Sequence, residues 1–117
     1  MNELFGTIPF EISNLSILIY LDLSLNNLSE EIPPQIGLLT NLEVLHLVET
    51  QLNGSIPLEI GQLKSLTKLF LYANHLHGWI PASLGNLSYL TYLYLNSNSI
   101  VKAQKCVKST RAVYTPN

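Results

Sequence analysis

Asp22, Ser24 and His46 have the three residue types that serine hydrolases combine, in which a histidine takes a proton from serine and a carboxylate orients the histidine. That chemistry needs the histidine between the other two, with oxyanion-stabilising donors nearby. The alternating pattern described below places all three on a flat strand surface, which offers no such donors. We therefore expect a surface ion pair between Asp22 and His46, and no catalytic triad.

His75 and His77 are the candidate metal ligands. They supply two nitrogens without an evident third ligand, whereas zinc sites use three or four protein ligands. Cys106 is the only cysteine, so no intrachain disulfide or cysteine-based metal cluster can form, and we expect a free thiol. We expect no cofactor, no bound metal and no enzymatic activity.

An internal repeat of 24 residues must position these side chains. It comprises a half repeat at 2–14, full repeats at 15–38, 39–62 and 63–86, and a half repeat at 87–100. In each repeat two leucines, such as Leu21 and Leu23, alternate with variable residues, and this period of two predicts a half-buried strand. The recurrence predicts four parallel strands in one sheet, with the leucines on its buried side.

A polar residue recurs where the chain turns after each strand. An asparagine amide can bond to the inward-pointing turn backbone, which predicts a buried column of Asn2, Asn26, Asn74 and Asn98. Thr50 interrupts this column. Because a hydroxyl supplies one donor, we predict a weaker turn at Thr50.

Ile-Pro pairs follow the column in every repeat and predict a second extended segment, then a short helical turn. The glycines expected to end that turn in a left-handed conformation are Gly37, Gly61 and Gly85. Another glycine recurs before the Ile-Pro pair, at Gly6, Gly54 and Gly78. Glu30 and Lys102 replace it, and we expect local distortion there.

The pattern LxxLxxLxLxxNxLxGxIPxxIGx resembles plant-specific leucine-rich repeats over residues 2–100. The resemblance implies a right-handed α/β solenoid with a parallel sheet on its concave face and irregular or short 3-10 segments on its convex face. The pattern is similar to ectodomains of plant leucine-rich-repeat receptor kinases and to polygalacturonase-inhibiting proteins. We expect residues 1–100 to form the repeat domain and 101–117 a non-repeat basic tail, disordered or loosely packed.

Ligand contacts are expected on the exposed side of the sheet, because the inward leucines are structural. The candidate ligand-binding residues there are Tyr20, Asp22, His46, Lys68, Phe70, Tyr72, Tyr92 and Tyr94, with Val44 and Val48 beside them. Aromatic side chains give large contact area at low entropic cost, which suits a peptide or protein ligand. They could equally stack across strands and only steady the sheet.

Four N-x-S glycosylation sequons begin at Asn14, Asn27, Asn53 and Asn86. They matter only if the chain is secreted. The residues of the repeat pattern itself also generate such sequons. All four fall outside the predicted binding face, so glycans would leave that face bare.

Charge and hydropathy limit the classes of partner that the chain can bind. Residues 1–100 carry a formal charge of −6, and the last 17 residues hold four spaced basic groups and no acid. Such spacing falls short of the clustered basic stripe that binds nucleic acid. The sequence shows neither a secretory signal nor an apolar run of about 18 residues, so we expect no direct membrane contact.

The leading hypothesis is a protein- or peptide-binding module from a plant cell-surface receptor-like kinase. Its partner would be a peptide or a co-receptor ectodomain at the extracellular face of the plasma membrane or in the apoplast. The alternatives are a secreted inhibitor of cell-wall-degrading enzymes and a truncated product without independent activity. Because the repeats begin and end without polar caps, we expect exposed leucines at the first repeat and self-association through the ends.

Overall fold

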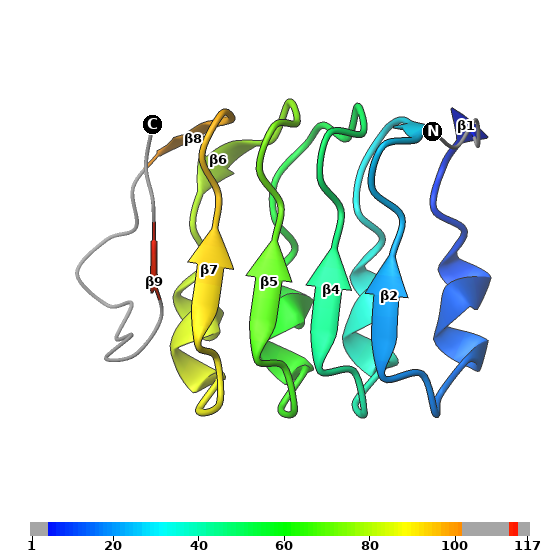
Figure 1. The fold of residues 1–117 in the computed structure, drawn as a ribbon, viewed down its shortest axis with the longest axis vertical. Coiled ribbons are helices and arrows are strands. Elements are labelled where there is room, and N and C mark those ends of the chain that lie inside the picture. Colours follow the sequence, from blue (N-terminus) through cyan, green and yellow to red (C-terminus); the bar gives the residue numbers. More distant parts are fainter. Residues whose placement is uncertain (1–4, 102–112, 115–117) are drawn as a thin grey trace.

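The main sheet follows from the alternating leucines. The computed structural model describes residues 5–101 and 113–114. Figure 1 faces the parallel sheet. Its strands, in order across the sheet, are β2 (Tyr20–Asp22), β4 (Val44–His46), β5 (Lys68–Phe70), β7 (Tyr92–Tyr94) and β9 (Val113–Tyr114). The first four are the predicted strands, and equivalent residues of successive repeats pair in register, as Leu21 does with Leu45.

The fifth strand corrects the predicted number. β9 lies parallel to β7, with Val113 opposite Tyr92 and Tyr114 opposite Leu93. It comes from the segment that we expected to be a disordered or loosely packed tail, where no repeat pattern indicated a strand. Pairing with the exposed backbone of an edge strand needs no repeat pattern, which is why the sequence did not reveal it. The basic residues of the tail and Cys106 lie outside the described residues.

The buried side of the sheet forms the core. Leu45, Leu47, Leu69 and Leu71 are fully buried, as predicted, and leucines and isoleucines of the return segments pack against them. The inward leucines of the first strand, in contrast, are only partly buried. The sheet ends at β2, so these leucines lack a neighbouring strand on one side within the described part of the chain.

The return path lies behind the sheet in Figure 1. It contains the 3-10 helices η1 (Phe10–Asn14), η2 (Pro34–Leu38), η3 (Leu58–Gln62) and η4 (Ala82–Asn86). The second extended segments form two small parallel sheets, β1 (Phe5–Gly6) with β3 (Asn27–Leu28) and β6 (His77–Trp79) with β8 (Ser99–Val101). A proline precedes each helix in extended geometry, as at Pro57 with φ −67° and ψ 139°. The predicted extended segments and short helical turns are therefore both present.

The prediction for Gly37, Gly61 and Gly85 is wrong. Positive φ occurs at none of them, and each helix passes into a leucine of negative φ, such as Leu63 at −81°. Gly37 and Gly61 are instead required by close packing between successive helices. A Cβ on Gly37 would lie 2.5 Å from the Glu59 carbonyl oxygen, and one on Gly61 would lie 2.6 Å from that of Ser83.

The backbone at Glu30 has the same conformation as at the glycines that Glu30 replaces. The predicted local distortion is therefore wrong at this position. Its φ is 65°, close to the 76° of Gly54. The Glu30 carbonyl oxygen accepts a hydrogen bond from Asn53 N, just as the Gly54 carbonyl accepts one from His77 N. The bonds between repeats therefore hold the turn in one conformation. Lys102 lies outside the described residues.

The asparagine column bonds to the turn backbone, as predicted, and it also ties neighbouring repeats together. Asn26 and Asn74 are buried as expected, whereas Asn98 is only half-buried. The buried Asn74 donates from Nδ2 to Leu47 O in the preceding repeat at 2.6 Å and to Leu71 O in its own at 3.1 Å. Asn98 repeats the arrangement, and Asn26 bonds to Leu23 O at 2.9 Å. Asn2 lies outside the described residues.

Candidate ligand-binding face

The strands bring the eight predicted ligand-binding residues onto one surface, because β2, β4, β5 and β7 are in register. We call this surface the sheet face, defined as Tyr20, Asp22, His46, Lys68, Phe70, Tyr72, Tyr92 and Tyr94. Their side chains are exposed or half-buried. Ligand binding by these residues stays a prediction.

A column of stacked rings runs across the middle of the sheet face. His46 lies parallel to Phe70 with ring centroids 4.5 Å apart and an interplanar angle of 6°. Phe70 in turn stacks on Tyr94 at 4.7 Å and 15°. Asp22 ends the column, with its Oδ2 atom 3.5 Å from His46 Nδ1. The expected pairing of Asp22 with His46 is thus present as a contact, which is an ion pair when His46 is protonated. The column changes from acidic to aromatic along its length.

Tyrosines border this column on both sides. Tyr72 and Tyr92 each meet Tyr94 edge to face at 6.3 Å, and Tyr20 meets His46 in the same manner at 5.5 Å. The Lys68 ammonium nitrogen lies 6.0 Å from the centre of the Tyr92 ring. Ring-to-ring contacts of this kind restrict the side chains before any ligand arrives, which lowers the entropic cost of binding.

Asp22 is the described group on this face whose ionisation is clearly altered. Burial raises the pKa of its carboxyl group, but hydrogen bonds from the backbone and hydroxyl of Ser24 and the attraction of His46 outweigh that effect. The pKa of Asp22 therefore lies below its ordinary value of 3.8, and the carboxylate stays charged at neutral pH.

The hydrolase arrangement is not assembled. The Ser24 hydroxyl oxygen accepts a hydrogen bond from Val48 N at 2.9 Å, and no hydrogen bond joins Ser24 to His46 within the described residues. His46 instead contacts Tyr20 OH through Nδ1 at 3.5 Å, while its Nε2 atom is buried without a hydrogen-bond partner among the residues described. Its imidazole is therefore a stacking element of the column.

Val48 is buried, whereas we expected it on the exposed side of the sheet beside the ligand-binding residues. Only 8% of it is exposed, because the bonds between repeats place it between the chain at Ser24 and at Tyr72. Val44 is half-buried.

The two histidines considered as metal ligands do not act together. His75 Nε2 lies 3.0 Å from Gln51 Oε1, whereas His77 belongs to β6 on the return path. Within the ranges that the structure describes, no group of three or more potential ligands is placed to hold a metal ion. None of the described helices has the length and apolar character that crossing a membrane would require.

The four sequon asparagines are all exposed and lie outside the sheet face. Asn14 and Asn86 end η1 and η4, Asn27 lies in β3, and Asn53 bridges to Glu31. Glycosylation at these positions stays a prediction.

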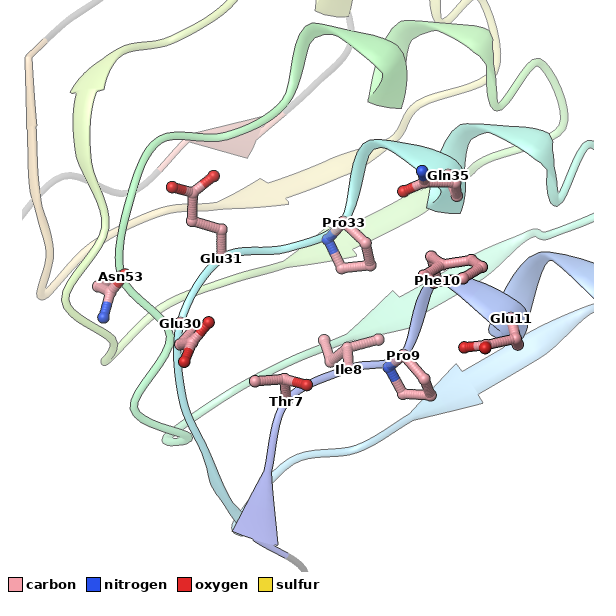
Figure 2. Close-up of a pocket in the computed structure, with 10 residues that line it drawn as sticks. All are labelled: Thr7, Ile8, Pro9, Phe10, Glu11, Glu30, Glu31, Pro33, Gln35 and Asn53. Carbon is pink, nitrogen blue, oxygen red and sulfur yellow. The ribbon is translucent and has the colours of Figure 1, made fainter.

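Figure 2 shows a feature that the sequence reasoning missed, a groove of about 610 Å³ on the return path. It is lined by Thr7, Ile8, Pro9, Phe10, Glu11, Glu30, Glu31, Pro33, Gln35 and Asn53. The residues directly after each Ile-Pro pair recur with the repeat, and following that column along the chain could have indicated the groove.

Comparison with known proteins identifies the repeat. The chain matches a family model described as a leucine-rich repeat region over residues 3–111, whereas no match was found among curated proteins. Its structure is similar to the ectodomain of the plant membrane receptor kinase GASSHO1/SCHENGEN3 from Arabidopsis thaliana, in complex with CASPARIAN STRIP INTEGRITY FACTOR 2. The identity is 43% and the TM-score 0.83, over 85% of this chain and 12% of that one.

Two further structures share the fold. A chain of the BIR3–SERK2 complex from Arabidopsis thaliana is 35% identical with a TM-score of 0.83, over 97% of this chain and 62% of that one. A plant ice-binding protein is 38% identical with a TM-score of 0.75, over 82% of this chain and 31% of that one. The resemblance to plant receptor-kinase ectodomains is confirmed, and the family match is to a repeat region, not to an enzyme. This chain belongs to the leucine-rich-repeat family.

Proposed function

We propose that the chain is a ligand-recognition module of a plant receptor-kinase ectodomain, and that its sheet face binds an extracellular peptide or a co-receptor ectodomain. The stacked column of His46, Phe70 and Tyr94 supports this most directly. It presents apolar ring surface across three successive strands, on the side of the sheet without core leucines. Aromatic residues at the centre of an interface commonly provide most of the binding energy.

The column also suggests how a ligand lies. A segment crossing the strands would meet the Asp22 carboxylate at one end and the Phe70 and Tyr94 rings at the other. We therefore expect a ligand with a hydrogen-bond donor or cation at one end and apolar side chains at the other. Two similar structures are complexes, one with CASPARIAN STRIP INTEGRITY FACTOR 2 and one between BIR3 and SERK2, which supports a peptide or a receptor as the partner class.

Peptide selection tests this proposal. Peptides selected from a random phage-displayed library on the chain would be synthesised and titrated calorimetrically against Phe70→Ala and Tyr94→Ala. Each substitution is expected to weaken binding by at least about tenfold, because it removes ring surface at the centre of the face. Tyr89→Ala, an exposed aromatic change outside the sheet face, is the matched control. Equal effects of all three substitutions would exclude the aromatic column as the binding site.

The same proteins separate the alternative function. A secreted inhibitor of cell-wall-degrading enzymes would lower the activity of a fungal polygalacturonase in a reducing-sugar assay. We expect the wild-type chain at micromolar concentration to leave that activity unchanged, and inhibition that Phe70→Ala abolishes would favour the inhibitor. As a receptor module, the chain would act at the outer face of the plasma membrane or in the apoplast.

A further inference from the structure

The return path carries a second surface built by the repeat. The first residue of each 3-10 helix follows the Ile-Pro pair, so Phe10, Pro34 and Leu58 occupy equivalent positions in successive repeats. Phe10 is 59% exposed and Leu58 63%, and Trp79 on the neighbouring β6 is 54% exposed. A soluble protein rarely leaves such an ordered row of large apolar side chains open to water without a partner.

Two grooves follow this row and adjoin. The first is the groove of Figure 2, and the second, of about 860 Å³, runs from Glu31 past Pro34 and Leu58 to Trp79. Glu31 lines both grooves, so they form one surface that spans the first half repeat and the three full repeats. We call it the return groove, defined as Glu11, Glu31, Pro34, Leu58, Glu59 and Trp79.

The charge of the return groove is one-sided. Glu11, Glu31 and Glu59 belong to it and Glu30 lines its first part. Among the described residues no lysine or arginine lines it, and His77 is the one basic side chain there. Figure 2 shows Glu11 on one of the chain segments that border the first groove, and Glu30 and Glu31 on another. The ion pair that the structure records among the described residues is Asp22 with His46, on the sheet face. Within the described residues no ion pair involves the carboxylates of the return groove, so an incoming cation would not have to displace one.

We propose that the return groove is a second binding surface, for a cationic segment of a partner protein that carries apolar side chains between its lysines or arginines. The apolar side chains would cover Pro34, Leu58 and Trp79, and the cations would pair with Glu11, Glu31 and Glu59. The negative potential disfavours nucleic acid and anionic membrane surfaces as occupants. The site is separate from the sheet face, so it would let the module bind two proteins at once.

Calorimetry with a synthetic peptide of alternating lysine and leucine tests the proposal, with a glutamate–leucine peptide of equal length as the opposite charge. The full chain should bind the lysine–leucine peptide and not the glutamate–leucine peptide. Its affinity for the lysine–leucine peptide should fall as the salt concentration rises. The triple variant Glu11→Gln, Glu31→Gln, Glu59→Gln should weaken binding by about tenfold, because three exposed charge pairs are lost. Trp79→Ala should weaken binding independently of salt.

Matched controls separate the groove from net charge. Glu43→Gln with Glu49→Gln removes exposed charge beside the sheet face and should keep the affinity of the wild type. Circular dichroism melts would show that every variant is folded. Absence of binding, or an equal loss in the Glu43 and Glu49 variant, would overturn the proposal. The opposite result is that a peptide with the sequence of residues 102–111 binds more tightly than the lysine–leucine peptide while the chain forms dimers. That result would overturn the proposal of a partner protein and identify a second copy of the chain as the occupant.

Discussion

At Thr50 the asparagine column loses an amide that neighbouring repeats possess. The Thr50 hydroxyl donates its one proton to Asn74 Oδ1, and Thr50 N donates to the same oxygen at 3.0 Å. Nothing at position 50 donates to Leu23 O and Leu47 O, the equivalents of the two carbonyls that Asn74 reaches. Leu23 O accepts a hydrogen bond from the amide of Asn26, and Leu47 O accepts one from the amide of Asn74.

Thr50→Asn is therefore expected to raise the free energy of unfolding by roughly 1 kcal/mol in urea denaturation, because it restores two donors in a buried turn. The acceptors can take them, since Leu71 O already accepts from both Asn74 and Asn98. Thr50→Val, of similar shape, should destabilise instead, because Asn74 Oδ1 loses its hydroxyl donor. A melting temperature of Thr50→Asn at or below that of the wild type would contradict this role of the column.

Asp22 gives the stability a dependence on acid. Its folded pKa lies below the ordinary 3.8, so the unfolded chain binds the proton more tightly. The stabilisation is therefore present above about pH 4 and disappears as the pH falls through the lower folded value. We expect the difference in unfolding free energy between the wild type and Asp22→Asn to shrink as the pH is lowered from about 5 to about 2. A difference that stays constant over that range would remove Ser24 and His46 as stabilising partners.

Among the elements, the 3-10 helices are spaced by their glycines. Gly61 lies inside η3 and is buried, and a Cβ there would approach Ser83 Cβ and Ser83 O to 2.6 Å. Both atoms belong to Ser83 in η4, so η3 and η4 would have to move apart. The packing of the return path therefore depends on the lack of a side chain at Gly61 as well as on the buried leucines.

Gly61→Ala should lower the free energy of unfolding by about 1–3 kcal/mol, the usual cost of inserting a methyl group into a closed contact. Lys64→Ala, an exposed change just after η3, should leave stability nearly unchanged and serves as the control. Equal urea midpoints for the two variants would show that the helices can separate without cost.

The elements also show what a sequence can predict. Leu21, Leu45 and Leu69 recur with the period of the repeat, so the strands, their register and the shared sheet face could be predicted from spacing alone. The conformation of Gly61 could not, because a glycine that permits a left-handed turn and one that permits close approach look identical in sequence. β9 comes from a segment outside the repeat pattern, so only the structure reveals it. The return groove follows the residues after each Ile-Pro pair, and that recurring column could have indicated it.

On the scale of the whole molecule, two sides differ in chemistry. The sheet face carries stacked rings with one charged pair, and the return groove carries carboxylates beside separate apolar side chains. Because the sequon asparagines lie outside the sheet face, glycans there would leave it open, whereas Asn53 lines the first part of the return groove. A glycan on Asn53 would therefore be expected to hinder the second site and spare the first.

The end of the sheet at β2 governs how the isolated chain behaves in solution. Phe5 and Ile17 are each 83% exposed, Leu15 and Ile19 more than half, and β2 is the edge strand of the described sheet. Apolar side chains beside an edge strand favour pairing with another chain. We therefore expect oligomers in sizing chromatography at micromolar concentration.

Ile17→Lys should shift these oligomers toward monomer, because a charge at the centre of the apolar end would have to be desolvated in the assembly. Leu58→Lys adds the same charge at a 63% exposed position on the return path and should leave the elution volume unchanged. This pair locates the contact, since net charge changes equally in both variants. A wild-type chain that elutes as a monomer with a sharp melt would mean that the partly buried Leu21 and Leu23 suffice to close the first repeat, and that burial by a neighbouring strand is unnecessary there.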